Sequence, residues 1–462
     1  MFTFFDAGKH GTRRDFLTVG SLAGLSLPAL LAGKALATEA GRPLTTGKSV
    51  IMVMMHGGPS QIETWDPKPD APSNNRSATG RVQTSIPGVS FGGTFPRIAE
   101  RAHKLAIVRN YQVENGNHDI KPVVSPHSLN ANLGSLYARV AGSLRANGMP
   151  TNVALFPNSV DARGPGARTN FGNFTSTGAL GASYSPFVPG AGGQMQQNMT
   201  LNLSRERLDD RRALLSQIDT LRRQIDASGS MAAVDRFHEQ AHDVILSGIA
   251  RAFDLSRENQ RLVDAYDTAG LDRPNSWAHK NNRTNYTAHA RSLGKLLLLA
   301  RRLCESGCGF VLVNTEFVWD MHQDVNNLGV HEGMDYVGTP FDHALSMYID
   351  DVESRGLSDD ILLVATGEMG RTPRLQTNGG RDHWGRIAPL LLHGGGMTHG
   401  QVLGQSTRDG GEPASNPQRI PNLISTIMHT LFHVGDVRLL PGLPGDVNRV
   451  ITEAAPIPGL MV

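Results

Sequence analysis

Two apolar runs in the second half of the chain are each followed by a cluster of polar residues. The runs are Phe310–Val313 and Ile361–Ala365, and their uninterrupted hydrophobicity is typical of strands buried in a parallel sheet. Between them, residues 336–355 alternate apolar and polar positions with a helical period, and Gly356 follows. The pattern predicts a strand, a crossover helix and a second, parallel strand.

The remaining pattern extends this unit into an α/β domain. Further strands are predicted at 49–55, 105–108, 153–156 and 387–393, and helices at 96–103, 287–305 and 422–432. Residues 202–267 are charged and helical in period, which predicts a helical insertion beside the sheet. We therefore expect a mostly parallel sheet between helix layers.

Residues that suit a metal ion follow the two apolar runs. Asp320 and His322 come after the first run, Glu368 after the second, and His383 after a glycine-rich loop. Because ligands bind beyond the carboxyl ends of strands in open parallel sheets, we expect these four side chains to converge on one ion. Mixed oxygen and nitrogen ligands suit zinc, manganese or iron. The alternative is that the carboxylates cap helices or pair with nearby arginines.

A glycine pair stands directly after the first predicted strand. Gly57, Gly58 and Ser60 form a turn whose backbone N–H groups are candidates for binding an anion. A simple tight turn explains the same residues equally well. Both interpretations stay open at the level of sequence.

Two further positions are candidates for catalysis. His118 lies in the polar segment after the strand at 105–108, and it is the stronger candidate, although a turn would also explain it. Gly88–Gly92 matches the G-x-S-x-G pattern around Ser90, but no strand–turn–helix context surrounds it. We therefore do not expect Ser90 to be a nucleophile.

Three motifs together resemble a known family. They are W-D-x-H at 319–322, G-E-x-G-R-T-P-R at 367–374 and N-G-G-R-D-H-W at 378–384. They resemble an exported bacterial family labelled domain of unknown function 1501, which is similar to sulfatases and to the alkaline-phosphatase-like superfamily. The resemblance extends over about residues 48–455, as a single domain.

The resemblance implies an alkaline-phosphatase-like fold and a metal-dependent hydrolase of sulfate or phosphate esters. Arg371 and Arg381 would then neutralise charge that develops on the substrate. Two positions depart from the superfamily: a glycine replaces a metal-binding aspartate after the first strand, and Met369 replaces a histidine. The alternative function is a non-catalytic exported module that binds polyanions or proteins on the same scaffold. The metal would be zinc, manganese, iron or calcium, and the substrate an anionic ester or polysaccharide.

The first 37 residues have the form of a twin-arginine signal peptide. Arg13 and Arg14 precede a mildly apolar run at 18–33, and Ala35–Ala37 is an A-x-A cleavage site. Pro28 and the glycines of the run argue against a stable membrane anchor. We expect export by the twin-arginine machinery to the periplasm or beyond.

The charge and cysteine content exclude some functions. Removal of residues 1–37 leaves 40 basic and 40 acidic residues, so the processed chain lacks the basic surplus of a nucleic-acid-binding protein. Cys304 and Cys308 are the two cysteines. They are predicted as buried thiols, with a local disulfide as the alternative.

Replacement of both Arg13 and Arg14 by lysine should trap unprocessed precursor in the cytoplasm, because the export machinery reads the arginine pair. Cell fractionation and the mass of the accumulated chain measure this outcome. Normal processing of the double variant would remove the basis for export by this route.

Overall fold

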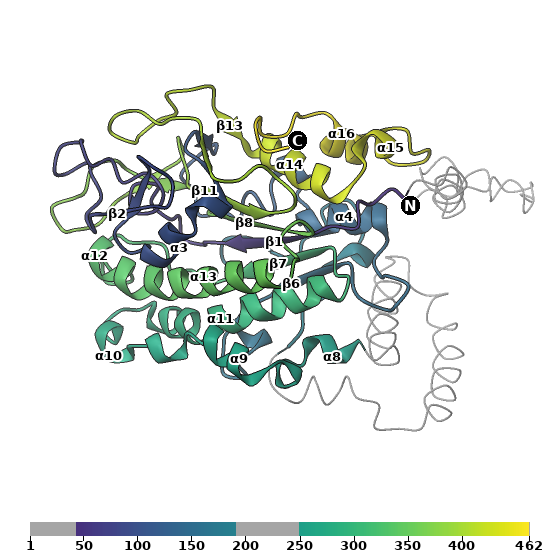
Figure 1. Ribbon diagram of the computed structural model, residues 1–462, viewed down its shortest axis with the longest axis horizontal. Coiled ribbons are helices and arrows are strands. Elements are labelled where there is room, and N and C mark those ends of the chain that lie inside the picture. The colour runs from purple at the N-terminus through teal and green to yellow at the C-terminus, as the bar shows by residue number, and fades with distance from the viewer. Residues whose placement is uncertain (1–42, 191–248, 462) are drawn as a thin grey trace, which may run out of the picture.

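A seven-stranded sheet forms the centre of the protein (Figure 1). The computed structural model describes residues 43–190 and 249–461, so the predicted signal peptide and most of the predicted insertion lie outside the described residues. The order of the strands is β12-β4-β11-β8-β1-β7-β6. Their bounds are β1 Ser49–Met54, β4 Leu105–Val108, β6 Asn152–Leu155, β7 Phe310–Asn314, β8 Ile361–Thr366, β11 Leu390–Gly394 and β12 Gln401–Leu403.

The sheet is mostly parallel, as predicted. β1 pairs in parallel with β7 and β8, β7 with β6, and β4 with β12, whereas β11 runs antiparallel to both of its neighbours. The strand predicted at 387–393 begins three residues later, at Leu390. Pro389, which has no N–H to donate to a sheet, directly precedes it.

Helices cover both faces of the sheet (Figure 1). α11 (Arg283–Glu305) and α13 (Thr339–Ser354) pack together on one face, and α4 (Leu133–Ala141) and α14 (Ile420–Leu431) lie on the other. The side chains of β1 alternate between the two layers: Ile51 and Val53 join the core with α11 and α13, while neighbouring positions join the core with α4 and α14. This two-sided burial explains why β1 is a continuous apolar run.

The predicted helices differ from the observed ones mainly at their ends. The helix expected at 336–355 is preceded by a short helix, α12 (Val330–Gly333), and a π-helical turn, Met334–Gly338. The helix expected at 96–103 is split into α3 (Pro96–Glu100) and a 3₁₀ turn, Ala102–Lys104. Of the insertion, the described part contains α8 (Ala250–Phe253) and α9 (Gln260–Tyr266), which pack on α11.

The structure also tests the predictions for the two cysteines and for Ser90, and it can be searched for membrane-spanning helices. Cys304 and Cys308 are free and buried. Ser90 lies in β3 (Ser90–Gly92), which pairs with β2 (Arg81–Gln83) in a two-stranded sheet, so the segment is not a nucleophile elbow. In the described part of the chain, no helix is both long and apolar enough to cross a membrane.

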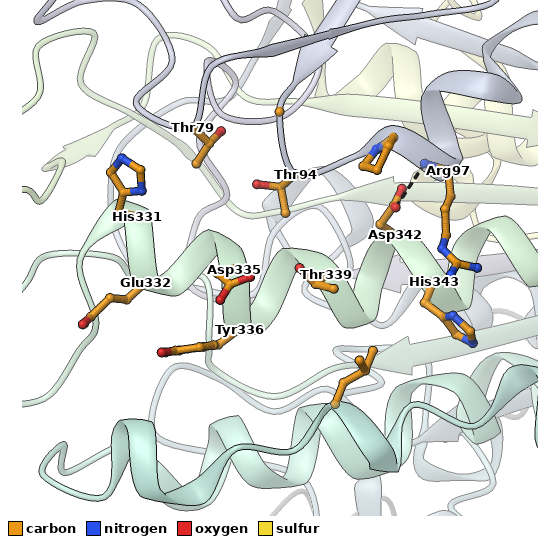
Figure 2. A pocket seen from close by; sticks show the side chains of 13 residues that line it. Thr79, Thr94, Arg97, His331, Glu332, Asp335, Tyr336, Thr339, Asp342 and His343 are labelled. Atoms are coloured by element: carbon orange, nitrogen blue, oxygen red, sulfur yellow. Dashed lines mark hydrogen bonds between the residues drawn. The ribbon is translucent and has the colours of Figure 1, made fainter.

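A cavity of about 650 Å³ lies between α12–α13 and the segment that leads into α3 (Figure 2). Thr79 and Thr94 face His331, Glu332 and other polar side chains of the helices. The cavity shares no residue with the polar clusters at the strand ends and is a separate surface feature.

The packing of α11 against α9 predicts a specific weak point. An added Cβ at Gly294 would lie 1.6 Å from the backbone oxygen of Tyr266. Gly294→Ala should therefore force the two helices apart and lower the free energy of unfolding by about 3 kcal/mol, measured by chemical denaturation. Gly435→Ala is the matched control, because α15 (Val434–Arg438) offers open space there. Equal stability of the two variants would contradict this packing.

Candidate metal centre

The polar clusters meet at the carboxyl edge of the sheet. β1, β7 and β8 end side by side, and the segments that follow them carry Gly57, Asp320 and Glu368. A short antiparallel pair, β9 (Gly370–Arg371) with β10 (His383–Trp384), brings His383 to the same place, directly opposite Arg371. The sheet register therefore positions segments that are far apart in sequence.

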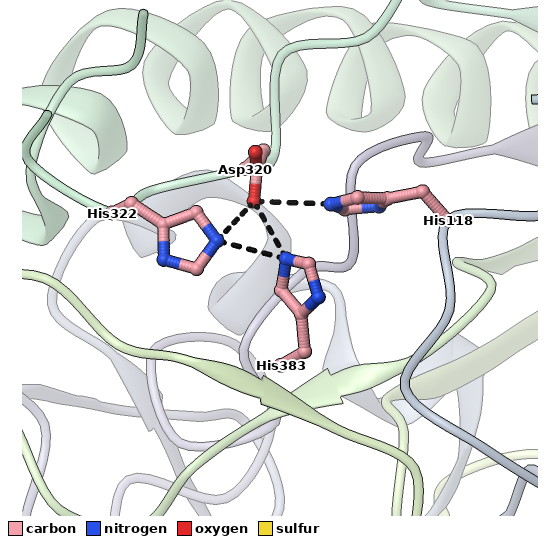
Figure 3. Close-up of side chains that lie close together, drawn as sticks. All are labelled: His118, Asp320, His322 and His383. Carbon is pink, nitrogen blue, oxygen red and sulfur yellow. Dashed lines mark hydrogen bonds and ion pairs between the residues drawn. The ribbon is translucent and has the colours of Figure 1, made fainter. Parts of the chain in front are cut away.

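Four side chains converge closely enough to share one ion (Figure 3). His118, Asp320, His322 and His383 each offer one ligand atom, and these atoms all lie within 4.8 Å of one another. The Asp320 Oδ1 atom is 2.9 Å from His322 Nε2, 3.3 Å from His118 Nε2 and 3.4 Å from His383 Nε2. His322 Nε2 and His383 Nε2 are 2.8 Å apart. Asp320 is buried, and the imidazoles line the more exposed side.

Glu368 orients His118. Its Oε1 atom lies 2.9 Å from His118 Nδ1, so the Nδ1 proton points to the carboxylate and the Nε2 lone pair points to the group. His118 Nε2 is buried and has no aligned hydrogen-bond partner in the described chain, since its 3.3 Å approach to Asp320 is poorly directed. In metal sites, a histidine ligand usually donates one ring N–H to a carboxylate, and its second ring nitrogen binds the ion. His118 has this arrangement.

Electrostatics keep both carboxylates of the centre ionised. Burial opposes charge on Asp320, but His118, the other two histidines and Arg371 outweigh it and hold the pKa of Asp320 well below its usual range. Burial also opposes charge on Glu368, yet nearby imidazoles lower its pKa. For His118, burial disfavours the cation, but the nearby Asp320 and Glu368 carboxylates accept from the ring and raise its pKa. A bound cation would compensate the negative charge of the two carboxylates.

A chain of asparagines fixes the far oxygen of Asp320. Asn327 Nδ2 donates to Asp320 Oδ2 at 2.9 Å, and Asn282 Nδ2 donates to Asn327 Oδ1 at 2.6 Å. Asn285, on the first turn of α11, donates in turn to Asn282 at 3.4 Å. Because Oδ2 is engaged in this way, Oδ1 is the oxygen that faces the three imidazoles.

The backbone N–H of the glycine turn donates to a carboxylate of the protein itself, that of Glu368. Gly57 N donates to both oxygens of Glu368, at 3.0 and 3.2 Å. The carbonyls of Gly57 and Gly58 accept from Arg371, and Ser60 Oγ accepts from the backbone of Glu63. An added Cβ at Gly57 would lie 2.7 Å from the backbone nitrogen of Asp320, so only glycine permits this approach.

Both arginines predicted as catalytic are fully buried and extensively bonded. Arg371 donates to Asp320 Oδ1 at 2.6 Å, to the carbonyls of the glycine turn and to that of Arg381. Arg381 forms an ion pair with buried Glu63 at 2.8 Å and donates to three backbone carbonyls. Their donors are used inside the protein, where they cross-link the loops that carry the centre.

The structure thus redistributes the predicted roles. Asp320, His322 and His383 lie together, as the strand-end argument anticipated. His118, predicted as a catalytic residue, occupies the fourth position, and Glu368, predicted as a ligand, lies behind His118. Asn327 and Asn282 carried no signal in the sequence, because a polar loop residue and the residue that precedes a helix are both common without a role in a site.

The sheet and this group of residues define an α/β protein with a site that can hold a metal ion at the carboxyl edge of its sheet. The chain belongs to the family described as "Protein of unknown function (DUF1501)", which matches residues 47–459. This confirms the family predicted from the three motifs. No curated protein matches the sequence.

The solved structures that resemble this chain include sulfatases and related enzymes. The PsFucS1 sulfatase from Pseudoalteromonas sp. is 9% identical with a TM-score of 0.36, over 87% of this chain and 70% of that one. The phosphonate monoester hydrolase SpPMH from Silicibacter pomeroyi is 11% identical with a TM-score of 0.34, over 83% and 73%. The lipoteichoic acid synthase LtaP from Listeria monocytogenes is 9% identical with a TM-score of 0.33, over 93% and 82%. Similarity at this level assigns no role to any residue of the site.

The asparagine chain predicts an effect on metal binding. Asn327→Ala removes the donor to Asp320 Oδ2, and loss of such an outer contact should weaken the binding of zinc or manganese about 10- to 100-fold in calorimetric titration. The control is Asn326→Ala, since Asn326 lies on the same loop but bonds to Asn281 at the surface. If the two variants bind metal equally well, Asn327 does not position Asp320.

Proposed function

We propose that the protein holds one divalent metal ion between His118, Asp320, His322 and His383 and hydrolyses sulfate or phosphate esters. The observation that carries the proposal is the convergence of three imidazole Nε2 atoms and one carboxylate oxygen, with His118 Nε2 buried and unsatisfied. Four such atoms equal the ligand number of structural zinc sites, so a catalytic ion here would take water or substrate at a further coordination position.

The donor set favours some metals over others. Three imidazoles and one carboxylate suit zinc, manganese or iron, whereas calcium and magnesium prefer oxygen ligands throughout. We therefore propose zinc, manganese or iron and set calcium aside.

The charges around the centre suit an anionic substrate. Arg371 and a divalent ion would together outweigh the negative charges of Asp320 and Glu368, so the loaded centre would attract anions. A bound metal ion polarises an ester oxygen and lowers the pKa of a bound water. Glu368 keeps the Nδ1 proton on His118, and Arg371 and Asn327 hold Asp320 in place. His383 is the most exposed member of the group, with a side chain 34% exposed, so substrate would approach past it.

A second function, a non-catalytic binding module, also has an observation in its favour. Ser125 and Asp119 follow His118 in the same polar segment and have side chains that could serve as nucleophile or base. Ser125 is buried in the turn before a 3₁₀ helix, and Asp119 pairs with Lys121 at 2.8 Å, so neither lies within the group of four side chains. A hydrolase would accordingly need water as its nucleophile. If water is not activated, the same centre would only bind anions.

The proposal includes export of the protein to the periplasm or beyond. It is supported by the twin-arginine pattern at 13–14 and the cleavage site that ends at Ala37. The double lysine variant described above tests it.

Metal content and ester hydrolysis test the proposed function together. His118→Ala, His322→Ala and His383→Ala should each weaken metal binding by at least about tenfold, because each removes a ligand, and chelator should lower the melting temperature of the wild type. His279→Ala, at an exposed position outside the group, should change neither quantity. Metal content is measured by elemental analysis, and activity on aryl sulfate and aryl phosphate.

The outcomes separate the candidates. Stoichiometric metal and metal-dependent release of the aryl alcohol support the hydrolase. Stoichiometric metal without turnover of either ester supports the binding module. A wild type that binds no metal and does not respond to chelator overturns both the centre and the hydrolase.

A further inference from the structure

An arginine with an unused donor lies beside the candidate metal centre. The guanidinium carbon of Arg168 is 5.7 Å from the ring centroid of Phe171 and 5.4 Å from that of Phe317. The two phenylalanine rings are stacked, with centroids 4.5 Å apart. Their cation–π contacts with Arg168 hold the guanidinium against the pair without using its N–H groups.

The same two rings contact the centre. The imidazole centroid of His118 is 4.8 Å from Phe317 and 5.5 Å from Phe171. The phenylalanine pair is therefore in contact with a candidate metal ligand and with Arg168 at the same time. It forms an apolar wall next to the centre, and Phe171 is only partly buried.

Arg168 differs from the two arginines of the motifs in how its donors are used. Arg371 and Arg381 donate to carboxylates and backbone carbonyls, and Arg371 Nη1 also lies 3.2 Å from His322 Nε2. Arg168 Nη1 is buried and has no hydrogen-bond partner. Among the described residues no carboxylate lies within 4.0 Å of Arg168, so its charge is not neutralised by an ion pair. A buried, charged donor without an acceptor is costly, and an acceptor from outside the protein would remove this cost.

One buried carboxyl, that of Glu316, interacts with Arg168 without forming an ion pair with it. Glu316 interacts with Arg168 electrostatically but lies beyond ion-pair distance, and its own Oε1 atom is buried without a partner. Burial raises the pKa of Glu316 to about 7, against the opposing effect of Arg168. Glu316 also has a positive φ of 70°, a strained conformation for a non-glycine residue.

We propose that Arg168 binds the anionic group of the substrate, a sulfate or phosphate monoester, while the partly exposed ring of Phe171, backed by the buried Phe317, contacts its organic part. A guanidinium presents N–H groups in a planar fork that matches the oxygens of such anions. This inference rests on the proposed function, because the anion that Arg168 binds would be the ester on which the metal centre acts. It assigns to Arg168 the role that the sequence assigned to Arg371 and Arg381.

The test uses inorganic phosphate as the probe and the full-length, metal-loaded protein. Arg168→Gln should weaken phosphate binding about 10- to 100-fold in calorimetric titration, the loss expected for charge-assisted hydrogen bonds. Arg168→Lys keeps the charge and should recover part of the affinity. Arg163→Gln is the matched control: Arg163 lies on the same loop with a side chain 82% exposed, and its removal should leave phosphate affinity unchanged.

Metal stoichiometry, measured in the same samples, separates this inference from the proposed function. If wild type and Arg168→Gln bind metal equally and only the variant loses phosphate affinity, the inference holds. If both bind metal and phosphate equally well, or if Arg163→Gln loses as much affinity as Arg168→Gln, Arg168 is not the anion-binding residue. If the wild type binds no metal, the proposed function fails first and the inference fails with it.

Discussion

The carboxylate of Glu368 is the contact on which the rest of the site depends. It is fully buried, and a buried charge is tolerated only when the protein compensates it. Two sources supply that compensation: the backbone N–H of Gly57 at the end of β1 and the imidazole of His118 from a distant loop. One carboxylate thus joins the ends of two strands to the loop that brings the fourth candidate ligand. Without it, His118 would lose the hydrogen bond that fixes its tautomer.

Much of this arrangement could be predicted from local sequence. Continuous apolar runs predicted the parallel strands, and the rule that ligands bind beyond the carboxyl ends predicted that Asp320, His322 and His383 would lie near one another. The α/β class with a mostly parallel sheet is confirmed. The strand direction of β11 and the split of the helix at 96–103 were not predicted, because hydrophobic periodicity carries no information on strand direction and little on helix ends.

The division of roles within the site was beyond the reach of sequence reasoning. Glu368 and His118 stand 250 positions apart, and only the folded sheet shows that one orients the other. The same is true of the arginines: Arg371 and Arg381 sit in the motifs, yet tertiary contacts use up their donors. Arg168 stands in a glycine- and proline-rich loop without any motif, and its significance comes from what surrounds it rather than from its neighbours in the chain.

The wide separation of the ligands has a consequence for how the protein acquires its ion. His118 belongs to a loop before α4, His322 follows β7, and His383 comes from a hairpin beyond β8. In the unfolded chain, bringing these imidazoles together would close very long loops, which costs conformational entropy. In the folded chain the sheet has already closed these loops, so metal binding does not add this cost. The ion would therefore recognise the finished sheet and not the nascent chain. Bound metal would act as a reporter of correct assembly, and it would shift the balance between native and unfolded molecules toward the native form by mass action.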